Sequence, residues 1–438
     1  MASEPELKTV SELQEQGILL VEDGNHGENR PRPNEFVDEG VKFIRAADMD
    51  GGRVLFEAAQ CINAVARKRV RKGIGAAGDV LLSHKGTVGK VAFVPLDAPD
   101  FVCSPQTTFW RVTDESRLDR RYLYFYLQSR AFVEQLDARK GETDMAPYVS
   151  LTNQRTLNII LPPLPEQKAI ARILGTLDDK IELNRRMNAT LEAMARALFQ
   201  SWFVDFDPVH AKAAGRQPAG MDPQTAALFP DSFQSSELGE IPVGWSVGKI
   251  SDLTEFSRSS VNPANFPKET FDHYSLPAFD EGRQPKAEAG AEIKSNKLIV
   301  APDAVLLSKL NPHIPRIWLP KLSETRRSVC STEFLVARPS SLSSQEYLFS
   351  LFTSSRFSTA YSTLVTGTTG SHQRIKADAV QNLGTVIPPE KLVVAFTDFA
   401  RPLFARINHN TAESRTLATL RDTLLPKLLS GEVAAHQS

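Results

Sequence analysis

Residues 165–206 read PEQKAIARILGTLDDKIELNRRMNATLEAMARALFQSWFVDF, and they carry the clearest structural signal in the chain. Proline suits the first turn of a helix, and the glutamate after it complements the positive end of the helix dipole. From Ile170 to Trp202, apolar or amide side chains recur at alternating steps of four and three residues, the heptad spacing of a coiled coil. The positions are Ile170, Leu174, Leu177, Ile181, Asn184, Asn188, Leu191, Ala195, Leu198 and Trp202. This pattern predicts one long helix whose seam must pack against another helix.

A second stretch near the carboxyl end repeats this seam at a constant offset of 226 residues. Its positions are Phe396, Ala400, Leu403, Ile407, Asn410, Ser414, Leu417, Arg421, Leu424 and Leu428. Polar residues fall at the same depth in both seams: Asn184 and Asn188 in the first, Asn410 and Ser414 in the second. Such a layer fixes the coiled-coil register, because a slipped pairing would leave buried amides without partners. We therefore predict two paired antiparallel helices, each about 60 Å long at 1.5 Å per residue.

The segments that precede the two helices also repeat each other. VLLS at residues 80–83 recurs at 305–308, and VCS at 102–104 recurs at 329–331. Short β-branched or alternating stretches predict strands at residues 41–44, 80–82, 91–94 and 109–112, whereas 122–136 and 345–364 show helical spacing. Two such repeats predict an α+β fold. Two globular domains would be separated by two long antiparallel coiled-coil helices and related by an internal pseudo-two-fold repeat.

These patterns divide the 438 residues into five parts. We expect the first globular domain at residues 1–162 and the first long helical region at 163–206. Residues 207–244 are rich in Pro, Gly, Ser and Ala, which predicts a linker. The second globular domain would follow at 245–387, and the second long helical region at 388–431.

Composition bounds the class of protein. No apolar run approaches the roughly 18 residues of a membrane helix, so we expect a cytoplasmic protein. Three cysteines without Cys-x-x-Cys spacing support neither a disulfide framework nor a zinc ribbon. The net charge of −1 argues against a general nucleic-acid coat, but local sums are −7 for residues 1–60, +6 for 61–90 and +5 for 294–327. The two basic stretches occupy related positions in the repeat, which favours two similar binding surfaces over ordinary solvated faces.

Several motifs together resemble a known family. LPPLPEQ at residues 161–167, the seam that follows it and WFVDF at 202–206 look like the central helical region of Type I restriction-modification specificity subunits. LGEIP at 238–242 with GW at 244–245 resembles the entry into the second target-recognition domain of that family, and LPKLLSGE at 425–432 resembles its ending. The duplicated architecture covers nearly the whole chain.

The resemblance implies a non-catalytic reader of DNA sequence. Each globular segment would be a target-recognition domain that binds one half of a bipartite, asymmetric site in double-stranded DNA, and the paired helices would set the spacing. Two methyltransferase subunits would dock on the helical regions, and restriction and translocase subunits would complete the complex. Adenine-N6 methylation and DNA cleavage would belong to these partners, which would also carry S-adenosylmethionine, ATP and Mg, whereas this chain would carry no cofactor.

Sequence signals for catalysis in the chain itself are weak. GIGAAG at residues 73–78 has the glycine spacing of a dinucleotide site, but a basic run precedes it and a predicted strand follows, which is the wrong context. NPHI at 311–314 lacks the second proline and the aromatic of an adenine-methyltransferase motif, and the eight histidines show no metal-ligand spacing. A self-contained methyltransferase or nuclease is therefore the weakest alternative. The stronger alternative is a helical scaffold or adaptor whose globular ends bind protein.

Side chains suited to DNA contact cluster in the loops of both repeats. Arg and Lys bind phosphate and guanine, and Asn and Gln bind adenine. The first-domain candidates are Arg67, Lys68, Arg69, Arg71, Lys72, Lys85, Thr87, Tyr148 and Asn153, and the second-domain candidates are Lys309, Asn311, His313, Arg316, Ser371, His372, Gln373 and Arg374. The loops at 141–145 and 367–370 are the expected points of backbone approach. No metal ligand is predicted.

Overall fold

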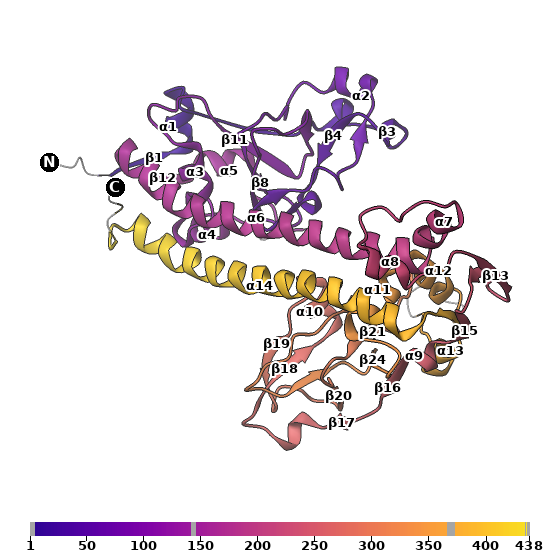
Figure 1. Ribbon diagram of the computed structural model, residues 1–438. Helices are drawn as coiled ribbons and strands as arrows, with labels where there is room; N and C mark the ends of the chain where they lie inside the picture. The colour runs from indigo at the N-terminus through magenta and orange to yellow at the C-terminus, as the bar shows by residue number, and fades with distance from the viewer. Residues whose placement is uncertain (1–4, 142–145, 366–372, 434, 436–438) are drawn as a thin grey trace. The chain divides into compact units, whose positions relative to one another are not determined.

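The computed structural model describes residues 5–141, 146–365, 373–433 and 435 (Figure 1). Packing contacts divide the chain into two compact units. The first unit contains residues 1–183 and 413–438, and the second contains residues 184–412. Each unit therefore holds one globular domain together with half of each long helix. In the part of the chain that is described, no helix is both long and apolar enough to cross a membrane.

The two long helices are confirmed. α6 spans Leu164–Phe203 and α14 spans Glu390–Leu429, each with 40 residues. Within the second unit the two helices are antiparallel, because Asn184 bonds to Asn410 near one end while Trp202 packs on Phe396 near the other. Pro402 and Pro426 lie inside α14, so neither proline ends the helix.

A buried amide layer lies in the seam of the second unit. Asn184 and Asn410 are both fully buried, and the Nδ2 of Asn410 donates to the Oδ1 of Asn188 over 2.9 Å. The Nδ2 of Asn188 donates to the Oγ1 of Thr411 over 3.2 Å. Thr411 therefore also belongs to this layer. The register role of these residues stays a prediction.

The first unit is built on two main sheets. Its six-stranded sheet has the order β2 (Leu19–Asp23), β11 (Thr107–Val112), β8 (Val80–Ser83), β9 (Val91–Phe93), β6 (Arg53–Val54), β5 (Met49–Asp50). The four-stranded sheet has the order β10 (Phe101–Cys103), β4 (Val41–Ile44), β7 (Cys61–Ile62), β3 (Phe36–Val37), and β1 (Glu6–Thr9) pairs with β12 (Asn158–Leu161). The helices are α1 (Val10–Glu15), α2 (Ala64–Arg69), α3 (Arg120–Tyr126), α4 (Arg130–Asp137) and α5 (Leu151–Arg155).

The second unit repeats this topology. β16 (Thr254–Ser257), β24 (Phe334–Pro339), β21 (Val305–Ser308) and β22 (Ile317–Trp318) follow the same order as β2, β11, β8 and β9. The second sheet has the order β17 (Ser260–Val261), β20 (Lys297–Ile299), β23 (Ser328–Cys330), β18 (Thr270–Tyr274), β19 (Lys286–Ala289), and β15 (Ser246–Lys249) pairs with β25 (Gly384–Ile387). Its helices include α9 (Ile250–Leu253), α10 (Leu276–Asp280), α11 (Gln345–Thr353), α12 (Ser355–Ser362) and α13 (Ala377–Gln381). The internal repeat is therefore a repeat of structure.

The repeated VLLS strands are buried on both faces. In the first unit, Val80 and Leu82 join the core that contains α3 and α6, whereas Leu81 joins a second core on the other face of the sheet. In the second unit, Val305 and Leu307 likewise join one core, whereas Leu306 joins the core on the other face of the sheet. Successive side chains of a strand point to opposite faces, so a strand between two cores must be apolar throughout.

Two segments differ from the expectation. Each predicted helix at 122–136 and 345–364 is a pair of short helices, because Ser129 and Ser354 cap the second member by accepting from the backbone N of Phe132 and Phe357. The expected linker at 207–244 is folded. It contains α7 (Asp207–Ala213), α8 (Pro223–Ala227) and a hairpin of β13 (Phe233–Ser236) and β14 (Gly239–Pro242). Its Val209, Phe229 and Ile241 are buried in the core of the second unit.

Candidate nucleic-acid interface

Two loops of the first unit, distant in sequence, are joined by backbone hydrogen bonds. We call residues 84–90 and 146–150 the first cradle. The backbone N of Gly86 donates to the O of Pro147 over 2.9 Å, and the N of Val149 donates to the O of His84 over 2.9 Å. Lys85 pairs with Tyr148 in the resulting bridge, and its Nζ lies 5.7 Å from the centre of the Tyr148 ring. Lys85, Tyr148 and Thr87 are exposed, so this rim can meet a partner.

The second unit builds the same frame from different residues. We call residues 309–316 and 373–376 the second cradle. The N of Asn311 donates to the O of Gln373 over 2.9 Å, and the N of Ile375 donates to the O of Lys309 over 3.1 Å. Asn311 has a φ of +49° and occupies the position of Gly86, whose φ is +79°. Gly and Asn are the residues that adopt this left-handed conformation most readily, so both loops keep one backbone path.

His84 supports the first cradle from below. Its side chain is fully buried, its Nδ1 lies 3.0 Å from the carbonyl O of Val149, and its ring lies 5.5 Å from that of Tyr148. The carbonyl only accepts, so Nδ1 carries the proton, and the buried Nε2 has no hydrogen-bond partner among the described residues. Burial lowers the pKa of His84, because a second proton would place an unpaired charge in the interior.

The basic helix α2 lies on the four-stranded sheet of the first unit, beside β3 and β4 (Figure 1). Lys68, Arg71 and Lys72 are exposed, and Arg67 is half-buried. Arg69 instead binds inside the unit, where its Nη1 donates to the Oε1 of Glu35 over 2.9 Å. Hydrogen bonds from the Arg69 guanidinium lower the pKa of Glu35 to about 2. The side chain of Arg69 is thus engaged by a carboxylate, and its contact with DNA stays a prediction.

The end of β2 connects α2 with the first cradle. The Oδ1 of Asn25 accepts from the backbone N of Arg71 over 3.1 Å and from that of Lys72 over 3.3 Å. Thr108 of β11 pairs with Asp23 at the end of β2 and with Leu82 near the end of β8, which places the end of β2 close to His84 and the first cradle. The structure therefore brings the segment of Arg71 and Lys72 toward the first cradle, although the two are separate in sequence.

Comparisons with known proteins agree on one family. Residues 25–193 match the family described as Type I restriction modification DNA specificity domain. The chain is 26% identical over 375 residues to the Type I restriction enzyme MjaIX specificity subunit of Methanocaldococcus jannaschii, covering 82% of this chain and 78% of that protein. It is 24% identical over 419 residues to the HindI specificity subunit of Haemophilus influenzae, covering 84% and 88%. The crystal structure of a Type I restriction-modification S subunit from M. genitalium has the same fold, with a TM-score of 0.53, 13% identity and coverage of 97% and 96%.

The chain is similar to Type I restriction-modification specificity subunits over most of its length, and residues 25–193 match their DNA specificity domain. This family is non-catalytic, in agreement with the weak catalytic signals in the sequence. Among the described residues, no group of three or more His, Cys, Asp or Glu could hold a metal ion. Cys103 and Cys330 are buried, and burial raises the pKa of each thiol to about 12, which makes both poor nucleophiles.

Carboxylates engage three of the seven basic residues in the second basic stretch, and also Arg374, which lies outside it. Arg316 binds Asp280 through Nε at 2.7 Å and Nη2 at 2.9 Å, and Arg374 binds Glu333 at 2.9 Å. Arg326 and Arg327 bind Asp272 and Glu269, and Lys297 is buried. The local sum of +5 therefore overstates the positive charge that this surface presents.

The remaining predicted contacts lie in the second cradle, in α5 or outside the described residues. Lys309 and Gln373 are half-buried in the second cradle, where His313 is exposed, and Asn153 is exposed in α5 of the first unit. Ser371 and His372 lie outside the described residues, as do the loop residues 142–145 and 366–370. The sequence reasoning missed His84 and Asn25, which position the first cradle and its basic neighbour. His84 directly follows the repeated VLLS motif, which was the available signal, whereas nothing local marked Asn25.

Proposed function

We propose that this specificity subunit reads a bipartite, asymmetric DNA site, one half through each cradle. The observation that carries the proposal is the duplication of one backbone frame with different side chains. Lys85, Thr87 and Tyr148 face outward on the first cradle, and Arg374 and His313 are exposed on the second. A constant frame with variable side chains is what two different half-sites require, because bases are distinguished by the donors and acceptors placed against them.

Phosphate binding would be unequal between the two units. The first unit offers the exposed Lys68, Arg71 and Lys72, whereas Arg316, Arg326, Arg327 and Arg374 of the second unit each meet a carboxylate. Phosphate contacts supply most of the non-specific affinity and make it depend on salt. We infer that partner subunits supply much of the positive charge around the second half-site.

The partners follow from the same proposal. The duplicated chain would present two equivalent helical surfaces to two methyltransferase subunits, since an internal repeat provides a pseudo-dyad. Those subunits would bring S-adenosylmethionine for adenine-N6 methylation, and restriction and translocase subunits would bring ATP and Mg. The paired helices would set the number of base pairs between the half-sites, and the complex would work in the cytoplasm, where its DNA lies.

Methylation mapping tests the proposal directly. The chain is expressed with its methyltransferase partner in a host without adenine methylation, and N6-methyladenine is mapped across the genome. We expect one bipartite asymmetric motif. Lys85→Ala with Tyr148→Ala should relax or change one half of that motif, and Gln373→Ala with Arg374→Ala should affect only the other half. Arg130→Ala is the matched control, because Arg130 is 88% exposed and bonds to Glu134 within its own helix.

Two outcomes would contradict the proposal. Loss of both halves in either cradle variant, with the fold intact, would mean that the cradles do not read separate half-sites. An assembled complex that shows no preference among DNA sequences at moderate salt would favour the scaffold alternative, because raised salt suppresses non-specific phosphate binding.

A further inference from the structure

The first globular domain meets the long helices through charged side chains. We call Arg121, Tyr124, Gly175, Asp178, Asp179 and Arg421 the first junction. The Nη1 of Arg121, on α3, donates to the Oδ2 of Asp179 over 3.0 Å. Asp178 accepts from the Nη1 of Arg421 over 2.7 Å and from the hydroxyl of Tyr124 over 3.3 Å. All of these contacts lie inside the first unit.

Gly175 leaves room for the guanidinium of Arg121 on the helix. A Cβ built at Gly175 would stand 2.8 Å from the Nη1 and 3.1 Å from the Cζ of Arg121, and the first of these distances is shorter than a real Cβ approaches. Glycine inside a helix is destabilising relative to alanine, so its presence in the middle of α6 needs a local reason. The guanidinium of Arg121 supplies that reason.

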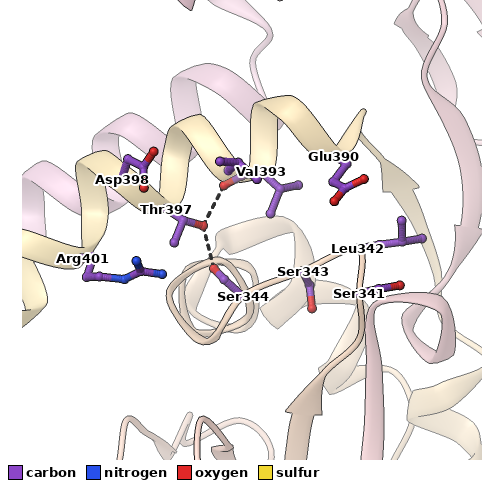
Figure 2. A pocket seen from close by; sticks show the side chains of 10 residues that line it. Ser341, Leu342, Ser343, Ser344, Glu390, Val393, Thr397, Asp398 and Arg401 are labelled. Atoms are coloured by element: carbon purple, nitrogen blue, oxygen red, sulfur yellow. Dashed lines mark hydrogen bonds between the residues drawn. The ribbon is translucent and has the colours of Figure 1, made fainter.

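The second unit has the same junction with the opposite chemistry. The repeat places Glu346, Phe349, Arg401, Phe404, Ala405 and Ala195 at the positions of Arg121, Tyr124, Gly175, Asp178, Asp179 and Arg421, and we call this set the second junction. The Nε of Arg401 donates to the Oε1 of Glu346 over 3.1 Å. Figure 2 shows Arg401 extending from α14 toward Ser344, the residue that caps α11.

Aromatic packing replaces the buried charges in this second junction. The rings of Phe349 and Phe404 meet edge to face with their centres 5.3 Å apart. Ala195 lines the same small cavity as these two rings, at the position where Arg421 stands in the first junction. The chain therefore uses one geometry twice, once with a carboxylate between an arginine and a tyrosine and once with apolar side chains.

We propose that the two junctions form a code that assigns each globular domain to its own long helix. If α3 docked on α14, Arg121 would meet Arg401, a like charge with a bulky side chain, where it now meets glycine. If α11 docked on α6, Glu346 would face Asp179, and Phe349 would cover the carboxylate of Asp178 and remove its hydrogen bond. Like charges and a desolvated carboxylate without a partner both oppose such pairing.

A chain that contains two similar domains needs this protection. Misassembly between like domains is a characteristic failure of repeated chains during folding, and repulsion in the wrong pairing is an effective way to prevent it. The code would also keep each half-site in its place in the bipartite motif, and only this consequence rests on the proposed function. The code itself is a property of the folded chain.

A double-mutant cycle on the full chain tests the code. All variants carry Asp179→Ala, so that a glutamate at position 121 does not face Asp179. In this background Arg121→Glu and Gly175→Arg give the first junction the ion pair of the second, and thermal unfolding is measured for each change alone and for the two together. We expect Gly175→Arg to lower the unfolding midpoint by about 5 °C, as expected for a like-charge contact with Arg121 in a unit of this size. The double variant should recover at least half of that loss, because the introduced glutamate and arginine can pair as Glu346 and Arg401 do.

The control replaces an arginine outside the junction. Arg130→Glu combined with Gly175→Arg should recover nothing, since Arg130 bonds to Glu134 on α4 and belongs to neither junction. Losses that simply add in the Arg121→Glu and Gly175→Arg double variant would overturn the proposal. If Gly175→Arg alone is insoluble, a soluble double variant supports the code and an insoluble one refutes it. The measurement uses no DNA, so its result is independent of the proposed function.

Discussion

Replacing the amide layer with leucine should make the protein more stable and less selective. Asn184 and Asn410 are fully buried in the seam, and Asn188 is half-buried. The layer is joined by hydrogen bonds of 3.4, 2.9 and 3.2 Å that end on Asn410, Asn188 and Thr411. The triple variant Asn184→Leu, Asn188→Leu, Asn410→Leu removes the side-chain amides together, so no buried amide loses its partner while the other remains.

The expected gain follows from the burial of these positions. A fully buried leucine side chain contributes about 2 kcal/mol, and the half-buried position contributes about half of that. The three hydrogen bonds contribute about 1 kcal/mol each in net terms. The triple variant should therefore gain about 2 kcal/mol, which raises the unfolding midpoint of a unit of this size by about 4–8 °C.

The loss of selectivity can be expressed as a change in the accepted spacer length between the half-sites. An apolar seam no longer opposes a slip by one heptad, which is seven residues at 1.5 Å, or about 10 Å. That distance is about three base pairs at 3.4 Å each. The assay compares methylation of synthetic sites whose spacers differ by one to four base pairs, with thermal unfolding measured in parallel.

Two results would refute the reasoning. A triple variant that is less stable than the parent chain would show that the amides stabilise the seam rather than specify it. A variant that is more stable but still accepts one spacer length would show that the register is set elsewhere. Asn410→Leu alone serves as the control, because it leaves the Oδ1 of Asn188 without the 2.9 Å bond and should gain little stability.

Three further predictions concern the first unit. The stability that depends on neutral His84 should be complete above about pH 6.5 and should be lost as the pH falls below it, since the unfolded state then binds a proton that the folded state disfavours. Urea unfolding between pH 7.5 and 5.5 measures this loss, and His84→Gln should make the free energy of unfolding less dependent on pH. Gly86→Ala should cost about 1 kcal/mol, because its φ of +79° strains a residue with a side chain, and an unchanged midpoint would contradict this. Arg111→Met should lower the free energy of unfolding by about 3 kcal/mol, because it leaves the buried Asp79 without the 2.7 Å bond from Nε. The double variant Arg111→Met, Asp79→Asn should recover part of this loss, and a fully additive loss would show that the pair is not the cause.

The predictable part of the candidate site was its location in the loops after the VLLS strands. Repetition of VLLS followed by polar residues was enough to nominate Lys85 and Lys309. Repetition could not show that residues 84–90 bond to residues 146–150, because that pairing joins segments about sixty positions apart in the sequence. Tyr148 was nominated by its place in the loop after Gly141, and the structure is what brings it to Lys85.

The long helices, the repeated VLLS strands and the internal repeat were all evident from the amino-acid order. Helical and strand periodicities are local, and a repeat needs only comparison of the chain with itself. The state of each charged side chain was decided by tertiary structure alone. Arg69, Arg316 and Arg374 read as free cations in the sequence, yet each meets a carboxylate at least 34 positions away. The meaning of Gly175 likewise emerged only when α3 laid Arg121 across it, because the chain order does not record which distant charge a fold brings into contact.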